Sequence, residues 1–102
     1  MDVPQKWIAY ECSDYFLSPL SETGWWDPDG QCWYIEPADR VSEDPWRGFL
    51  VIGRPGVDGI EWGYRMGKPG IWAHYPVEDE FRLLAESASD LRDGYSSGRI
   101  TV

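Results

Sequence analysis

The chain has little of what most protein chemistry depends on, with one histidine, two cysteines and nine basic residues among 102. Nine Lys and Arg against 18 Asp and Glu leave a net charge of −9 at pH 7. Binding to nucleic acids or anionic lipids depends on clustered Lys and Arg that neutralise phosphates. The charge balance therefore argues against direct binding to DNA, RNA or a membrane surface, and it favours a basic partner.

Long hydrophobic runs are also missing. No stretch approaches the roughly 18 apolar residues that a membrane-spanning helix needs. The segment from Met1 to Lys6 has no basic region followed by an apolar one, so we expect no signal peptide. Without export, Cys12 and Cys32 are expected to stay free thiols. These absences predict a cytoplasmic protein.

Aromatic residues, in contrast, are abundant, with seven Trp, six Tyr and three Phe. A chain that is also 42% hydrophobic has enough large apolar side chains to exclude disorder. Its 102 residues suffice for one core without metal or disulfide support. We find no repeat, low-complexity tract or linker, so residues 1–102 are expected to form a single domain.

Turn signals divide the chain from Gly24 onward into short strands. Trp25-Trp26 and Cys32–Ile35 flank Asp27-Pro28-Asp29-Gly30, whose Pro and Gly positions suit a type I turn. The acidic residues 37–46 are expected to form a loop or a short helical turn. Phe49–Ile52 is a continuous apolar run ended by Gly53, typical of a central strand that is buried on both faces.

The clearest alternation follows this run. Ile60, Trp62, Tyr64 and Met66 share one strand face. The turn Gly67–Gly70 and the segment Ile71–Tyr75 then complete a predicted antiparallel hairpin. Residues Phe81–Ala85 are expected to add a further strand.

Two segments have helical patterns. Ile8, Cys12, Tyr15 and Phe16 fall at helical spacing, and although aromatic residues 7–10 also suit a strand, we favour a helix that ends at Ser18-Pro19.

Near the C-terminus, Ser87 and Asp90 have the spacing of a capping box, which predicts the start of a helix. Its apolar stripe would consist of Ala88, Leu91 and Tyr95, and Gly98 suits its end. Residues 99–102 would add a last short strand. The sequence predicts an α+β fold: a mainly antiparallel sheet with one or two helices packed on it.

A pattern of glycine and aromatic positions runs through the second half of the chain. It comprises Gly53, the turn Gly56-Val57-Asp58-Gly59, the strand Ile60-Glu61-Trp62-Gly63-Tyr64, the returning Gly70-Ile71-Trp72-Ala73 and the helix around Ser87 to Leu91. Upstream, Asp14-Tyr15-Phe16-Leu17 is followed by Gly24. This pattern resembles the SUKH superfamily, known for bacterial toxin-immunity proteins and a yeast cell-wall regulator. The resemblance implies an α+β immunity-type binder with no chemistry of its own.

Candidate catalytic and metal motifs are weak. On the predicted strand, His74 and Trp72 face opposite to Ile71, Ala73 and Tyr75, so we expect His74 to be a half-exposed sheet residue. A catalytic role is not favoured, because neither cysteine has the surroundings of a nucleophile. One histidine and two separated cysteines are too few for a structural zinc site. A calcium loop that starts at Asp27 would place Ala38 at the position where a bidentate carboxylate is needed. The glycine-rich residues 53–59 lack the lysine that a phosphate-binding P-loop requires. No metal or cofactor is expected.

Acidic groups and one tryptophan are the candidate partner-binding residues. They are Glu36, Asp39, Glu43, Asp44, Glu78, Asp79, Glu80 and Trp72. Charge complementarity speeds association, while buried aromatics supply most of the affinity. Trp is abundant enough for one or two of its side chains to be exposed anchors. The alternative for these acids is a plain solvated face.

These observations favour a cytoplasmic immunity-type inhibitor that binds a basic protein toxin, such as a nuclease, and occludes its active-site cleft. Another hypothesis is a phage- or plasmid-borne decoy whose carboxylates imitate nucleic-acid phosphates and block a defence enzyme. A less favoured one is a small hydrolase using two carboxylates near a tryptophan, since Asp27, Asp29, Glu61 and Glu78 lie near Trp residues in the sequence. In so acidic a chain such neighbours arise by chance, so we expect no enzyme.

Overall fold

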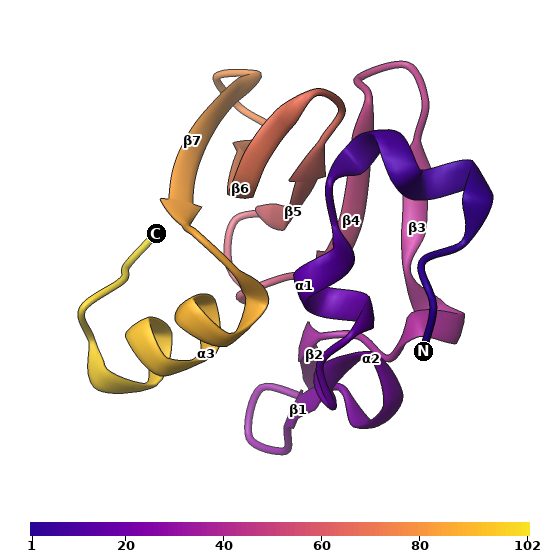
Figure 1. The fold of residues 1–102 in the computed structure, drawn as a ribbon. Helices are drawn as coiled ribbons and strands as arrows, with labels where there is room; N and C mark the ends of the chain where they lie inside the picture. Colours follow the sequence, from indigo (N-terminus) through magenta and orange to yellow (C-terminus); the bar gives the residue numbers. More distant parts are fainter.

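A five-stranded antiparallel sheet forms the centre of the protein (Figure 1). The computed structural model describes residues 1–102, and the strand order is β3-β4-β5-β6-β7. The strands are β3 (Ser42–Asp44), β4 (Phe49–Gly53), β5 (Glu61–Arg65), β6 (Lys68–Tyr75) and β7 (Glu80–Ala85). A separate hairpin consists of β1 (Trp25–Asp27) and β2 (Cys32–Ile35). With its short helices, this single domain confirms the predicted α+β fold.

The β1–β2 hairpin is attached to the main sheet through β4. Glu36 N donates to Ile52 O at 2.6 Å, and Arg54 N donates to Trp33 O at 3.1 Å. A 3-10 helix, η2 (Ala38–Arg40), follows β2 and leads into β3. Residues 37–46 therefore contain the predicted helical turn and, in addition, a short strand that the sequence did not indicate.

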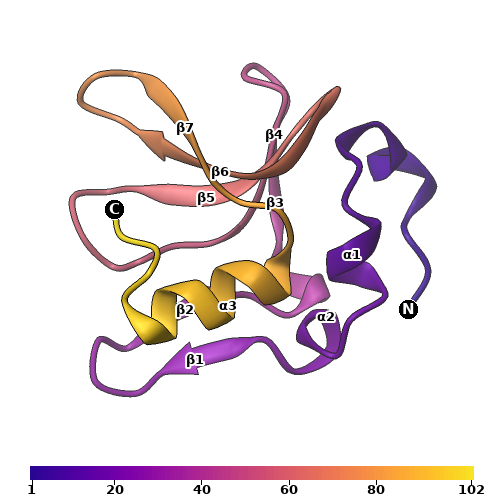
Figure 2. The same ribbon diagram turned by 60° about the vertical axis from the view of Figure 1, so that its left-hand side comes forward.

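The sheet is strongly bent, and Gly63 in β5 makes the bend possible. Figure 2 shows β3 and β4 running across the direction of β5. A Cβ at Gly63 would overlap the carbonyl oxygen of Leu50 in β4. Only glycine allows the two backbones to approach this closely. As a result, one face of the sheet covers the main core while the other folds towards itself.

The main core lies between the first face of the sheet and the helices. Its members are large apolar side chains from every part of the chain: Trp7, Tyr10, Cys12, Tyr15, Phe16, Leu20, Ile35, Leu50, Ile52, Trp62, Tyr64, Ile71, Ala85, Ala88, Leu91 and Ile100. Burial of this much apolar surface is the main stabilising contribution to such a fold. Every residue of β4 is buried, which confirms the predicted central strand.

The predicted β5–β6 hairpin is confirmed, with Trp62 opposite Ala73 and Gly63 opposite Trp72. Its turn is shorter than expected. Arg65 already pairs with Lys68, so Lys68, Pro69 and Gly70 belong to β6. Gly67 supplies the left-handed residue of a two-residue turn with φ 72°. Met66 is at the turn and exposed, so it does not extend the buried face.

The N-terminal segment is not the single helix that the spacing predicted. A 3-10 helix, η1 (Gln5–Tyr10), and a short helix, α1 (Ser13–Phe16), are separated by Glu11, which has φ 54°. This left-handed residue ends the first segment and rotates the next one. Trp7 and Tyr10 are buried as a result, while Ile8, expected on the apolar stripe, is exposed. A further short helix, α2 (Leu20–Thr23), follows.

The C-terminal helix, α3 (Ala88–Ser97), has the predicted start and end. Ser87 Oγ accepts a hydrogen bond from Asp90 N at 3.0 Å, and Gly98 ends the helix with φ 81°. Residues 99–102 form no strand, contrary to prediction, because Ile100 N donates to Gly94 O and folds the chain back onto α3. None of the helices is long and apolar enough to cross a membrane.

Candidate protein-interaction site

The second face of the sheet carries a small aromatic cluster. Phe49, His74 and Phe81 contact one another, with ring centroids 5.0 Å apart for Phe49 and Phe81 and 4.8 Å apart for His74 and Phe81. The guanidinium of Arg65 lies over the rings of Phe81 and Trp72, 4.1 and 4.8 Å from their centroids. The bend of the sheet brings these strands together, although β4 and β7 are not neighbours.

His74 is therefore buried, with 7% of its surface exposed, and not half-exposed as the strand pattern predicted. The alternation placed its side chain on the correct face. The error arose because a flat sheet would leave that face open to solvent, whereas the bent sheet covers it with Phe49 and Phe81.

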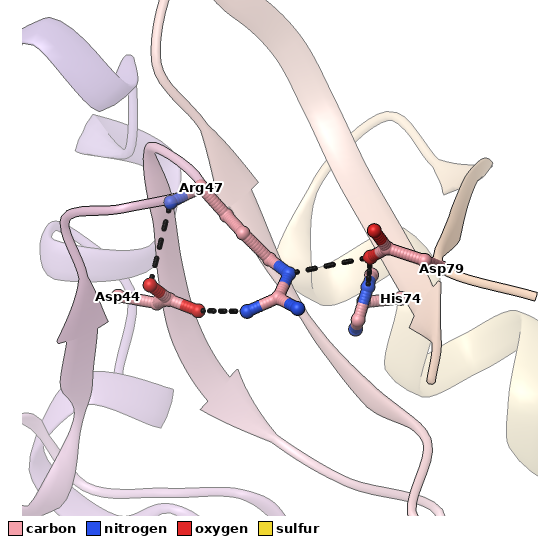
Figure 3. Close-up of polar contacts among 4 residues, drawn as sticks. All are labelled: Asp44, Arg47, His74 and Asp79. Atoms are coloured by element: carbon pink, nitrogen blue, oxygen red, sulfur yellow. Dashed lines mark hydrogen bonds and ion pairs between the residues drawn. The ribbon is translucent and has the colours of Figure 1, made fainter. Parts of the chain in front are cut away.

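An ionic bridge links two hairpin turns beside His74 (Figure 3). In the β3–β4 turn, Arg47 Nη1 contacts Asp44 Oδ2 at 3.0 Å. The same guanidinium contacts Asp79 Oδ1 of the β6–β7 turn through Nε at 3.4 Å. His74 Nε2 lies 2.8 Å from the same Asp79 oxygen. The bridge connects the two turns.

The charge state of Asp79 follows from these contacts. The hydrogen bond from His74, and after it the one from Arg47, lower the pKa of Asp79 below its ordinary value. The carboxylate therefore stays ionised, accepts from both groups and requires the proton of His74 on Nε2. Both contacts use Oδ1 of Asp79, and the side chain stays 69% exposed.

Trp46 is the most exposed large side chain at this end of the molecule. It occupies the β3–β4 turn next to Arg47 and is 94% exposed. Each of the other six tryptophans contacts an aromatic ring or a cation, and Trp46 contacts neither. Val77, in the β6–β7 turn beside the bridge, is 88% exposed. We call Trp46, Arg47, Val77, Glu78 and Asp79 the tip surface.

The sequence did not single out Trp46, although a signal was present. Asp44-Pro45 starts the β3–β4 turn just as Asp27-Pro28 starts the β1–β2 turn. Asp44 Oδ1 accepts from Arg47 N at 3.3 Å, and Gly48 has φ 60°. The Asp-Pro start with Gly at the end indicates a turn, and a turn leaves its central side chains exposed.

The predicted partner-binding acids do not form one patch. Glu78, Asp79 and Glu80 lie together at the β6–β7 turn, and the bridge brings Asp44 close to them. Glu80 pairs with Arg82 at 2.9 Å. Glu43 accepts a hydrogen bond from the Tyr10 hydroxyl at 2.7 Å. Asp39 is exposed in η2, away from this group in the chain.

Of the predicted residues, Glu36 is buried and Trp72 is only partly exposed. Glu36 is only 8% exposed, and its Oε2 atom has no hydrogen-bond partner. Burial is the main cause that raises the pKa of Glu36 above its ordinary value. Trp72 is half-buried, and its indole N–H donates to Pro69 O at 3.2 Å beneath Arg65. Glu36 is thus held inside the protein, whereas Trp72 keeps part of its ring exposed.

No three side chains among the His, Cys, Asp and Glu residues are placed together as metal ligands. The two cysteines are free thiols, Cys12 in the core and Cys32 in β2. The arrangement that stands out is instead an exposed aromatic side chain beside charged groups on two fixed turns.

Comparison with protein-family models, curated proteins and solved structures gives no match. The resemblance to the SUKH superfamily therefore stays a prediction from the sequence pattern.

Proposed function

We propose that this protein is a binding protein of the immunity type, without chemistry of its own, which inhibits a basic protein toxin by covering the toxin's active-site cleft. Trp46 is the observation that carries the proposal. An exposed Trp that packs against nothing in its own chain leaves a large apolar surface in water. Trp is among the residues that most often dominate the affinity of protein interfaces.

The charges around Trp46 support a basic partner. The two hairpins that carry the tip surface contain five carboxylates, Glu43, Asp44, Glu78, Asp79 and Glu80, and three basic side chains, Arg47, Lys68 and Arg82. Glu78 is in no ion pair. An excess of negative charge beside an aromatic anchor is complementary to a basic surface, which speeds association and orients the partner. The basic cleft of a nuclease is such a surface.

The fixed geometry of the two turns favours tight binding. Arg47 holds the β3–β4 turn to the β6–β7 turn, and His74 supports Asp79 from below. A surface that is ordered before binding loses less conformational entropy when the complex forms. Inhibition by occlusion needs one inhibitor molecule for each toxin molecule.

The test begins with capture of the partner from the native cell and continues with the purified partner. We expect a basic protein whose activity is abolished at a one-to-one ratio. Trp46→Ala should weaken the complex about 30-fold or more, the effect of a hot-spot residue. Trp26→Ala is the matched control, because Trp26 is also exposed, at 44%, but packs on Trp33 in the β1–β2 hairpin. An inhibited partner that binds both variants equally well would overturn the role of Trp46.

The decoy hypothesis remains a second candidate because the whole chain carries the net charge of −9. A decoy that imitates phosphates would bind through charge alone, with strong dependence on salt. It would compete with nucleic acid for a defence enzyme and would tolerate Trp46→Ala. Competition by nucleic acid together with unchanged binding of Trp46→Ala would favour the decoy over the immunity-type inhibitor.

A further inference from the structure

Next to the tip surface, the protein has a hollow of about 480 Å³ between the loop that precedes β5 and the β6–β7 turn. Val57 and Ile60 line it from the loop, and Pro76 and Val77 from the turn. Asp58 and Glu78 also line it, one from each side. The hollow therefore combines apolar walls with carboxylates from two separate segments, and it shares Val77 and Glu78 with the tip surface.

The free charges in this hollow are negative. Arg82, the basic side chain that lines it, is already paired with Glu80 at 2.9 Å. Its guanidinium also lies over the Tyr75 ring, 4.2 Å from the centroid, and so forms part of the wall. Asp58 and Glu78 make no ion pair and no side-chain hydrogen bond within the protein. Both carboxylates are exposed and available to a cation.

We infer that this hollow is a subsite for a lysine or arginine side chain of the protein partner, an inference that rests on the proposed function. The chemistry of such a side chain matches both features of the hollow. Its aliphatic stem would cover Val57, Ile60 and Val77, and its charged end would lie between Asp58 and Glu78. Arg82 also lines the hollow, but its ion pair is with Glu80 and with neither of these two carboxylates.

The subsite gives the proposed complex a second fixed point beside Trp46. An aromatic anchor alone leaves the partner free to rotate about it, whereas a basic side chain held in a neighbouring hollow determines the orientation. Charged groups at an interface contribute to register and specificity in this way. The subsite also favours partners with an exposed basic side chain beside the surface that receives Trp46.

A test without the natural partner uses two small probes, N-acetyl-lysine methylamide and N-acetyl-norleucine methylamide, which share a stem and differ in the ammonium group. Titration into the labelled protein, followed by NMR, should shift the amide signals of Val57, Ile60 and Val77 with the lysine probe. The norleucine probe should bind about two- to thirtyfold more weakly, the range for two exposed ion pairs. Shifts elsewhere, or equal affinity for both probes, would overturn the inference.

Variants locate the charge recognition. The double substitution Asp58→Asn and Glu78→Gln should reduce the affinity for the lysine probe to that for the norleucine probe. Asn tolerates the left-handed backbone of residue 58, which has φ 55°, so the fold should be retained. Glu22→Gln is the matched control, since Glu22 is an exposed acid on α2 outside the hollow. An unchanged affinity in the double variant would contradict the subsite.

The same variants separate this inference from the proposed function once the partner is purified. If Trp46→Ala weakens the complex and the Asp58/Glu78 double variant does not, the subsite is wrong and the proposed function stands. If the lysine probe binds in the hollow but the captured partner is not inhibited, the proposed function fails and the subsite stands. If both variants weaken an inhibitory complex, both are supported.

Discussion

The hydroxyl of Tyr64 donates a hydrogen bond to Asp14 Oδ2 at 2.7 Å, joining β5 to α1 across 50 residues of sequence. The same oxygen accepts from Ala88 N, at 2.8 Å, at the start of α3. One carboxylate therefore connects the N-terminal segment, the central sheet and the C-terminal helix. It also satisfies an amide that the first turn of a helix leaves without an internal partner.

Tyr64→Phe should lower the free energy of unfolding by about 1.5–3 kcal/mol, the range for hydrogen bonds to charged groups. The ring stays in the core, so the loss reports the hydrogen bond. Urea denaturation measures it. Tyr95→Phe serves as control, because the Tyr95 hydroxyl makes no hydrogen bond in the protein and its ring packs on Trp62. Equal stability of both variants would show that the Asp14 contact contributes nothing.

Glu36→Gln should change how stability depends on pH. Burial raises the pKa of Glu36 in the folded protein above its ordinary 4.5, so the folded state binds the proton more tightly than the unfolded state. Above 4.5 the wild type must therefore lose stability as pH rises through the folded-state pKa. The variant lacks this loss, and its stability relative to wild type should increase with pH.

Urea denaturation of both proteins at about pH 4 and about pH 7 tests this prediction. Glu22→Gln, at an exposed position, should show no such pH-dependent difference. A constant difference between Glu36→Gln and wild type would contradict the raised pKa.

The two thiols should differ strongly in reactivity. Burial raises the pKa of Cys12 to about 11, and its thiol donates to Trp7 O at 3.5 Å. Cys32 is half-buried in β2, and its pKa is also raised. Because the thiolate is the reactive form and Cys12 is also buried, Cys12 in the folded protein should react with Ellman's reagent more slowly than Cys32.

Ellman titration measures both rates, and Cys32→Ser should remove the fast phase. In denaturant without reductant the wild type should show both thiols. A count of zero there would contradict free cysteines.

Gly63→Ala should be severely destabilising, by about 3 kcal/mol or more, because the new methyl group meets the β4 backbone, which cannot move aside. Gly67→Ala is the control. Gly67 has a positive φ of 72° but no atom within 4 Å of a new Cβ, so it should lose only about 1 kcal/mol. Thermal denaturation compares the two. A similar loss for both would show that the bend of the sheet does not depend on Gly63.

Glu78→Lys should slow association with the purified partner several-fold and leave dissociation almost unchanged. Glu78 is exposed and in no ion pair, so it acts mainly on the encounter, over a Debye length of about 8 Å. Asp79 is unsuitable for this test, because its replacement would also release Arg47 and His74. Stopped-flow measurement with Glu22→Lys as the charge-matched control decides between a local and a general effect of charge. Equal slowing by both would exclude a local role for Glu78.

Local signals predicted much of this fold. The β5–β6 hairpin follows from the alternation around Trp62 and Tyr64, and α3 follows from Ser87 and Gly98, since each signal lies within the element it specifies. The sequence did not predict the break between η1 and α1. No local signal marks Glu11 as a left-handed residue, and its conformation depends on the packing of Trp7 and Tyr10 in the core.

The candidate site was predicted only in part for the same reason. The sequence indicated the acids at 78–80, but the contact of Asp79 with Arg47 joins residues 32 positions apart. It exists because the sheet is bent, and a bend of this kind depends on the packing of several strands at once. The exposure of Trp46 could have been predicted, because the sequence signals of its turn, Asp44-Pro45 and Gly48, are local.

The strand β7 ends the sheet, and the side chains of Glu80, Arg82 and Leu83 along it are exposed. An open strand edge is a template for another molecule's edge, and like net charge is one of the forces that keep such edges apart in solution. This protein has that protection at neutral pH through its charge of −9. Near its isoelectric point of about 4.3 the repulsion vanishes. Colloidal stability should therefore be lowest in mildly acidic solution, with β7 as the surface through which molecules first associate.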